Sequence, residues 1–270
     1  MTSSTRGIPR RAAEEQATDL RPPPAEAGDL FSARARQYAH DRPLHDVHVL
    51  EAGCGWGRGL DLGTREHRST GVDLDTPALR ANTRRRADLD AWHLGDLRTV
   101  PMPPRAYDIV HAPFLIERVP HAELVLDRFV ASLRPGGLLL VRLRDRDTAF
   151  GFLDRLLPRR LRERMWRGLA RTAPRRPDPD GWRPTGPPPP ALYDPVASRQ
   201  GMRWYCVMRG LVIAEEYTSR AGIEAFGAGT RLLTGLCRVV AALSRGRLSA
   251  DHSEVTLVIR KPESRFARVL

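Results

Sequence analysis

The chain has 270 residues, enough for one α/β domain with an added subdomain, and a formal net charge of +12. Because Lys261 is its only lysine, this charge is almost entirely arginine, and the accompanying alanines and prolines are typical of a GC-rich genome rather than of a nucleic-acid-binding surface. Cys54, Cys206 and Cys237 are far apart and form no C-x-x-C pair, which argues against a disulfide framework or a zinc site and favours a reducing cytoplasm. No apolar run reaches the roughly 18 residues of a membrane span.

The chain opens with a segment that predicts no packed structure. Residues 1–28 contain Pro22–Pro24 and show no apolar periodicity, so we expect a disordered tail. A short helix is expected over residues 30–39, as a cap on the edge of a sheet or as a cover over a ligand.

The stretch of residues 48–59 is the most informative part of the sequence. Apolar residues lead to Glu51, and two positions later every second residue becomes glycine. A buried strand over residues 47–52 followed by such a turn brings backbone close to a nucleotide-like ligand, because glycine has no Cβ and tolerates positive φ. The spacing is neither the dinucleotide fingerprint nor a P-loop. The alternative is a merely structural turn, and a helix is expected to begin near Arg58.

A second strand is predicted over residues 69–75, with Asp73 near its carboxyl end. An ionised aspartate there can accept hydrogen bonds from both hydroxyls of a ribose. The alternative is a charge that stabilises the N-terminus of the next helix. Thr76 as N-cap with Pro77 at the first helical position predicts that helix, which should run to about Arg86.

Further strands follow with the rhythm of an α/β sheet. A short strand over residues 92–94 ends just before Asp96, whose plain interpretation is a turn residue. Apolar patterning then predicts a strand (107–112), a helix (121–133), a turn (134–137) and an apolar strand (138–143).

Four ordered segments resemble the class I S-adenosylmethionine-dependent methyltransferases. They are the acidic residue with its glycine turn, Tyr107-Asp108-Ile109-Val110, Glu117-Arg118-Val119-Pro120 and Ser132-Leu133-Arg134-Pro135-Gly136-Gly137. The resemblance covers residues 47–143 and implies S-adenosyl-L-methionine as the cofactor. It also implies a Rossmann-like fold, with a seven-stranded mostly parallel sheet, helices on both faces and a helical lid inserted between strands five and six.

The resemblance further implies roles for single residues. Asp73 is expected to bind the ribose and Asp96 to accept from the adenine amino group. The helix over residues 30–39 is expected to cover the cofactor, with Tyr38 lining the pocket. The expected cofactor-binding residues are Tyr38, Glu51, Gly53, Cys54, Gly55, Gly57, Asp73, Leu74, Asp96, Leu97 and His111.

Methyl transfer needs alignment more than acid–base chemistry, because the sulfonium is already an activated leaving group. His111 is the first candidate for a general base, with packing beside the cofactor as the alternative. Glu117 is the second catalytic candidate. Many relatives carry a histidine at the next position, and here Arg118 stands instead, which argues against a histidine base and indicates an acidic or carbonyl-bearing acceptor. No metal site is predicted.

The second half of the chain breaks this rhythm. Residues 150–173 predict a pair of basic amphipathic helices, and a proline-rich connector follows over 174–190. A lid over the substrate is the favoured interpretation, with a partner-binding helix or a helix on an anionic membrane as alternatives. The predicted units are a tail (1–28), a cofactor-binding core (29–145), an insertion (146–206) and a C-terminal part of the sheet (207–270), with strands over 211–217 and 254–259 around a helix near 232–243.

Together these observations predict a cytoplasmic methyltransferase for a small-molecule acceptor, with O-methylation of a secondary metabolite favoured. One alternative uses the same pocket for a non-methylating reaction, and another is a non-catalytic partner subunit. A nucleic-acid partner is not expected, because residues 111–114 lack the amide or acid with which the nucleic-acid branches of the resembling family hold an amino nucleophile. A homodimer and weak contact with a membrane surface are compatible with the sequence.

Overall fold

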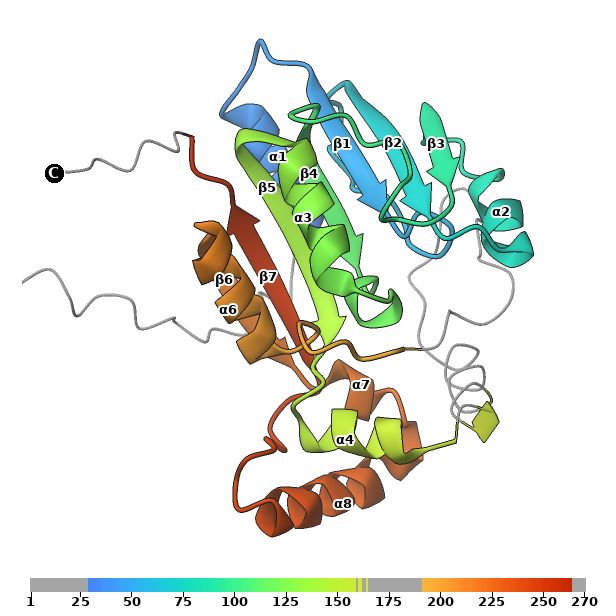
Figure 1. The fold of residues 1–270 in the computed structure, drawn as a ribbon, viewed down its shortest axis with the longest axis vertical. Coiled ribbons are helices and arrows are strands. Elements are labelled where there is room, and N and C mark those ends of the chain that lie inside the picture. Colours follow the sequence, from blue (N-terminus) through green and yellow to red (C-terminus); the bar gives the residue numbers. More distant parts are fainter. Residues whose placement is uncertain (1–28, 159, 162–163, 165–190, 264–270) are drawn as a thin grey trace, which may run out of the picture.

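The computed structural model describes residues 29–158, 160, 161, 164 and 191–263, which fold around one seven-stranded sheet of order β3-β2-β1-β4-β5-β7-β6 (Figure 1). β7 is antiparallel to β5 and β6, and the other neighbours are parallel. The strands are β1 (Val47–Ala52), β2 (His67–Asp73), β3 (Ala91–Leu94), β4 (Tyr107–Pro113), β5 (Leu133–Arg144), β6 (Val212–Ser219) and β7 (Glu254–Arg260). The predicted α/β sheet is confirmed.

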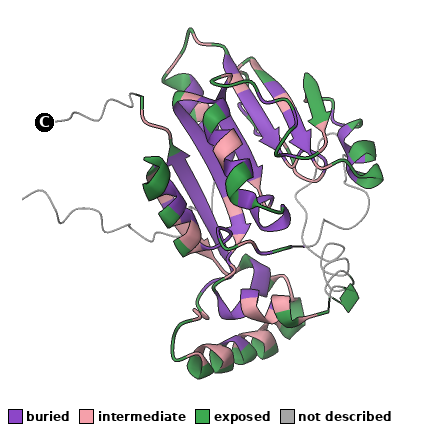
Figure 2. Cartoon of the chain, in the orientation of Figure 1, coloured by how far each residue is buried: buried purple, intermediate pink, exposed green. Residues whose placement is uncertain are grey.

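Alternating side chains send two apolar sets to opposite faces of the sheet. Leu50, Val110 and Leu139 belong to a large core cluster under α3 (Ala122–Ser132) and α6 (Arg199–Arg209). Their neighbours one residue away, such as Val49 and Ile109, join a second cluster under α1 (Leu30–His40). The centre of the sheet is therefore buried on both faces, as Figure 2 shows.

The helix expected to begin near Arg58 does not form, and turns and irregular backbone follow β1 up to Arg65. Two side chains take the carbonyl and amide groups that a helix would use. The guanidinium of Arg86 donates to the carbonyls of Cys54 (3.0 Å) and Gly57 (2.7 Å), and Glu51 accepts from the amide of Leu60 (2.9 Å). The alternating glycines also make a helix costly here.

The predicted cap of α2 (Pro77–Thr83) is confirmed, because the Thr76 hydroxyl accepts from the amide of Leu79 at 3.3 Å. The helix ends at Thr83 rather than near residue 86. The Arg86 guanidinium donates instead to the Asp88 carboxylate. β5 begins at Leu133, five residues before the predicted 138, because the turn pairs with the start of β4 across an irregularity in register.

Three helices form a smaller unit beyond the carboxyl end of β5 (Figure 1). α4 (Ala149–Leu156), α7 (Ala221–Glu224) and α8 (Thr230–Leu243) share a cluster of buried side chains that includes Phe150, Ile223 and Cys237. The remainder of the predicted helix pair, the proline-rich connector and the N-terminal tail lie largely or wholly outside the described residues. Two short 3-10 helices, η1 (Ile116–Arg118) and η2 (Gly227–Gly229), complete the described elements.

α6 was not predicted as a helix. Its N-cap is Ser198, whose hydroxyl accepts from the amide of Gly201 at 3.0 Å, and Gly210 ends it in the left-handed conformation. Met202 and Cys206 on its inner face belong to the large core cluster, although they fall in the range predicted as the insertion. Within the described ranges, no helix combines the length and apolar character that crossing a bilayer requires.

Candidate functional site

A cavity of about 350 Å³ opens at the carboxyl ends of β1, β2 and β4. The chain leaves β1 toward β2 and β3 in one direction and returns to β4 on the other side, so the cavity lies where the strand order reverses. In open α/β sheets this switch point is where ligands bind. Of the predicted cofactor residues, Gly53, Gly57, Asp73, Leu74 and His111 line the cavity.

The glycines of the turn have different tasks. Gly53 has a φ of +86°, which favours glycine, and its amide donates to the carbonyl of Val72 at 2.8 Å. Gly55 is needed for packing, because a Cβ there would lie 2.9 Å from the carbonyl oxygen of Leu79. A Cβ on Gly57 would meet only ordinary contacts, so its lack of a side chain leaves room on the cavity side.

Asp73 presents a buried carboxylate at the cavity wall. Its Oδ2 accepts from the amide of Gly55 at 2.8 Å and its Oδ1 from the amide of Leu74 at 2.7 Å. Burial raises the pKa of Asp73 to about 6, against the opposing effect of these two hydrogen bonds. Each oxygen retains a lone pair, so the group can also accept from hydroxyl donors of a ligand.

Trp56 supplies an independent sign that a polar ligand belongs here. Its indole Nε1–H is buried and has no hydrogen-bond partner among the described residues, and the side chain lines the cavity. A buried donor without an acceptor is costly, so a ligand acceptor would satisfy it. A second cavity of about 390 Å³ is lined by Asp96 and Leu97 and shares Leu74 with the first. The two cavities suit a long ligand with several polar groups.

Glu51 and His111 form a buried pair beside the cavity. They are direct partners across β1 and β4, and Oε2 of Glu51 lies 2.7 Å from Nδ1 of His111. The second carboxylate oxygen accepts from the amide of Leu60. Phe31 of α1 packs edge-on against the imidazole, with ring centroids 5.3 Å apart. The carboxylate therefore orients the histidine ring, whose position is fixed from two sides.

Two arginines bring positive charge to the cavity wall. Nε of Arg142 on β5 donates to the Thr256 hydroxyl at 3.1 Å, and its guanidinium lies over the ring of Phe31, 5.5 Å from the centroid. Its Nη2 lies 4.0 Å from a carboxylate oxygen of Asp29. Arg118 is almost fully buried, donates through Nε to the carbonyl of Phe114 at 2.7 Å, and has its pKa lowered by burial to about 10.

Comparison with known proteins agrees with this geometry. Residues 49–137 match the family model described as a methyltransferase domain. A protein of Mycolicibacterium smegmatis named a probable S-adenosylmethionine-dependent methyltransferase is 33% identical over 130 residues, which cover 46% of this chain and 50% of that protein. The trans-aconitate 2-methyltransferase of Methylobacterium nodulans is 33% identical over 102 residues, which cover 37% of this chain and 39% of that protein. Residues 49–137 therefore belong to a methyltransferase domain, and the sheet around them has the class I methyltransferase fold.

A solved methyltransferase, in complex with the Haloferax volcanii Trm112 methyltransferase activator, shares the fold. It is 17% identical, with a TM-score of 0.51, and the match covers 87% of this chain and 96% of that one. The chain spans about half the length of the curated relatives it matches. The comparisons therefore place the methyltransferase domain in the first half of the sheet, where the cavity lies.

Several predicted site residues do not line this cavity, among them Tyr38, Cys54 and Glu117. Tyr38 donates to Asp108 at 3.2 Å, and Phe31, two turns earlier on the same helix, faces the cavity instead. Cys54 is buried, with its sulfur 3.7 Å from the Thr83 hydroxyl. Glu117 is fully buried, and its carboxylate has no hydrogen-bond partner among the described residues.

Glu117 is not among the residues that line the cavity. Burial raises the pKa of its carboxyl group, and Arg118 opposes that effect from 3.6 Å. Its backbone carbonyl accepts from the amides of Leu192 (2.7 Å) and Tyr193 (3.0 Å), so the residue anchors the segment that precedes α6. Asp96 lines the second cavity, but its carboxylate is half-exposed and paired with Arg98 at 2.6 Å.

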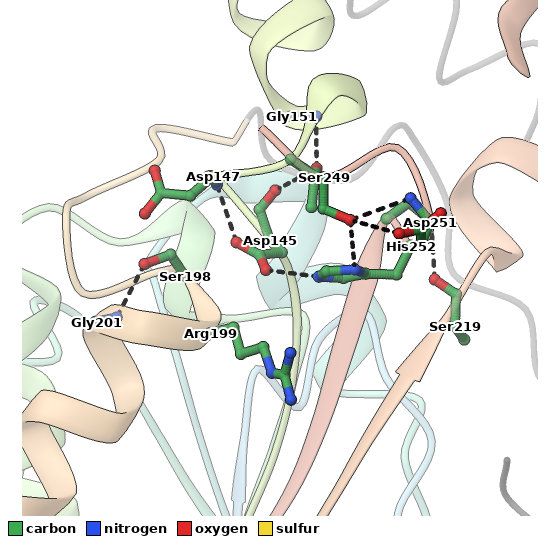
Figure 3. A network of polar contacts seen from close by, with 12 residues as sticks. Asp145, Asp147, Gly151, Ser198, Arg199, Gly201, Ser219, Ser249, Asp251 and His252 are labelled. Carbon is green, nitrogen blue, oxygen red and sulfur yellow. Dashed lines mark hydrogen bonds and ion pairs between the residues drawn. The ribbon is translucent and has the colours of Figure 1, made fainter. Parts of the chain in front are cut away.

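A second carboxylate–histidine pair joins the sheet to the smaller helical unit (Figure 3). Oδ2 of Asp145 lies 2.9 Å from Nε2 of His252, and the other ring nitrogen lies 3.5 Å from the Ser249 hydroxyl. Ser249 also accepts from the amide of Asp251 at 3.1 Å, and its carbonyl accepts from Ala149 at the start of α4. None of these residues lines the cavity at the carboxyl ends of β1, β2 and β4, so the group connects chain segments.

Proposed function

We propose that the chain is an S-adenosylmethionine-dependent O-methyltransferase whose acceptor is a small molecule carrying a carboxylate. The observation that carries this proposal is Arg142 on β5, a guanidinium at the wall of the cavity, which Arg118 also lines. Arginine suits the planar, two-oxygen geometry of a carboxylate. The names of relatives such as the trans-aconitate 2-methyltransferases, which act on an acid, support the same class of acceptor.

The cavity residues suit the cofactor. When bound, S-adenosylmethionine supplies a methyl group on an activated sulfonium. Gly53 and Gly57 would leave room for its amino-acid part, the Trp56 indole N–H would donate to its carboxylate, and Asp73 would accept from the ribose hydroxyls.

Alignment is then the main task of the protein. A carboxylate is ionised at neutral pH, so its oxygen takes the methyl group without losing a proton. Arg142, held through Nε by Thr256 and packed on Phe31, would orient that acceptor. The Glu51–His111 pair would form a polar wall beside it, and the product would be a methyl ester. No general base is required for this acceptor.

The test is methyl transfer from labelled S-adenosylmethionine to a panel of carboxylic acids and phenols, with Arg142→Gln and a matched control. Arg36→Gln is the control because it changes the same charge in an exposed ion pair with Asp61. We expect methyl esters from the acids, and we expect Arg142→Gln to raise KM for the acid by about tenfold or more while S-adenosylhomocysteine binding is unchanged.

The outcomes separate the alternatives. Products from phenols alone, unaffected by Arg142→Gln, would contradict a carboxylate acceptor. Folded protein that binds neither S-adenosylmethionine nor S-adenosylhomocysteine in calorimetry would contradict the enzyme itself and favour a partner subunit. A role in secondary metabolism, a homodimer and a cytoplasmic location remain predictions from the sequence.

A further inference from the structure

Helix α8 carries an apolar stripe that faces away from the rest of the molecule. Cys237 is buried against α4 and α7, with Leu233 and Val240 beside it. On the outer side, four aliphatic residues spaced four, three and four apart are exposed, at 82% for Leu232, 47% for Leu236, 55% for Val239 and 79% for Leu243. The helix therefore has two apolar sides, of which only the one around Cys237 is covered by other described elements.

The charges around this stripe have a single sign. Residues 230–248 contain four arginines and no acidic residue, and all four arginines are exposed. At 100° per residue, Arg231 and Arg238 lie together on one side of the stripe. Long arginine side chains can extend to a polar layer while the neighbouring aliphatic groups stay in an apolar one. A helix of this kind lies in the plane of a membrane interface.

We propose that α8 binds the surface of an anionic lipid bilayer, with Leu232, Leu236, Val239 and Leu243 among the acyl chains and the arginines at the headgroups. A second copy of the chain fits less well, because two such faces would bring arginines together with no acidic residue of α8 to pair them. The helix lies toward the end of the molecule to which the carboxyl ends of the parallel strands point (Figure 1). Binding would therefore hold the cavity end near the bilayer.

The test is sedimentation of the full chain with vesicles of phosphatidylcholine alone or mixed with phosphatidylglycerol. Because the chain has a net charge of +12, weak attraction to anionic vesicles is expected in any case, so the variants must separate charge from insertion. Leu236→Ser with Val239→Ser keeps the charge and removes apolar contact. Arg231→Gln with Arg238→Gln is compared with Arg68→Gln and Arg84→Gln, which remove equal charge from exposed positions on other elements.

We expect binding to the mixed vesicles, and we expect the serine pair to weaken it by about tenfold or more, as two aliphatic side chains leave the apolar layer. The Arg231/Arg238 pair should weaken binding more than the remote pair. Far-ultraviolet circular dichroism checks that each variant is folded. Serine variants that bind as tightly as the wild type would overturn the proposal. A lipid-independent dimer that the same variants dissociate would overturn it in favour of contact between two copies.

Discussion

Two carboxylate–histidine pairs lie at the carboxyl end of the sheet, and their surroundings give them different tasks. Glu51 and His111 are 2.7 Å apart, and Asp145 and His252 are 2.9 Å apart. All four side chains are buried. His111 lines the cavity, whereas His252 turns its other ring nitrogen toward the Ser249 hydroxyl. The same two functional groups therefore serve a ligand site in one place and a junction in the other.

The difference follows from topology. β1 and β4 are neighbours where the strand order reverses. The chain turns away from their carboxyl ends in opposite directions, so no connection covers those ends. β5 continues directly into α4, and the loop before β7 packs on that connection through a bridge between Thr148 and Ser249. The Glu51–His111 pair, at the ends of β1 and β4, therefore lies beside a cavity. The Asp145–His252 pair, after β5 and before β7, is covered by the connecting segments.

Removing the carboxylate of the cavity pair should have the largest effect on folding. Glu51→Ala would leave the Leu60 amide and the His111 ring without their acceptor in a buried place. We expect the free energy of unfolding to fall by about 3 kcal/mol, measured by urea denaturation. Glu51→Gln, which retains one acceptor oxygen, should lose less. A fully stable Glu51→Ala protein would show that the pair contributes little.

The next largest effect is expected on cofactor affinity, and it should occur for a variant at the cavity but not for one at the junction. Asp73→Asn should weaken S-adenosylhomocysteine binding by about 1–3 kcal/mol, because a charged acceptor is lost. His252→Asn in the same calorimetric assay should leave affinity unchanged. Equal losses in both variants would mean that the junction and the cavity are coupled.

The pKa of Asp73 adds a pH dependence to this binding. Because burial raises it to about 6 in the free protein, the carboxyl group accepts a proton as the pH falls through that value. A protonated group offers fewer acceptor sites to ligand hydroxyls, so affinity should decline below pH 6 and stay level above it. The effect of pH on the free energy of unfolding is the opposite. The raised pKa of Asp73 stabilises the folded state at low pH, and this contribution is lost as the pH rises through about 6. Asp73→Asn should remove the decline in affinity.

Much of the fold was predictable because local patterns and tertiary structure agree. Short apolar stretches indicated the strands, and Thr76 with Pro77 indicated the start of α2. The missing helix near Arg58 was not predictable, because it depends on Arg86, a residue distant in sequence that binds the carbonyls of the turn. α6 also escaped notice, although Ser198 and Gly210 are ordinary helix-end signals that could have revealed it.

The site was predictable where residues follow strands and less so elsewhere. Asp73 and His111 reach the cavity because strand register decides their position. Tyr38 does not, because it lies about two turns beyond Phe31 on the same face of α1. The start of α1 adjoins the cavity, and the sequence does not specify which turn does so. Glu117 turns inward because η1 bends the chain after β4. The position of Arg142 at the cavity wall was missed because its strand was identified from its apolar residues.

A smaller loss is expected at the junction. Asp145→Asn would weaken the contact with His252 and the hydrogen bond from the Asp147 amide, which is 2.9 Å long. The free energy of unfolding should fall by about 1–2 kcal/mol, with affinity for S-adenosylhomocysteine retained. Thermal unfolding with and without the ligand measures both quantities. A loss of ligand affinity without a loss of stability would contradict a purely structural role.

The smallest effect is expected at His111, the first candidate for a general base. His111→Asn keeps a donor for the Glu51 carboxylate, and a carboxylate acceptor has no proton to give up. Turnover should therefore fall by less than about tenfold, well short of the roughly 10²–10⁴-fold loss of a true general base. Single-turnover transfer between pH 6 and 8 is the measurement, with His252→Asn as the matched histidine control. If His111→Asn loses more than 100-fold while the cofactor still binds, and the wild-type rate rises with pH, then the Glu51–His111 pair acts as a base. The acceptor would then be a poorly acidic hydroxyl, since only such a group needs a histidine to remove its proton.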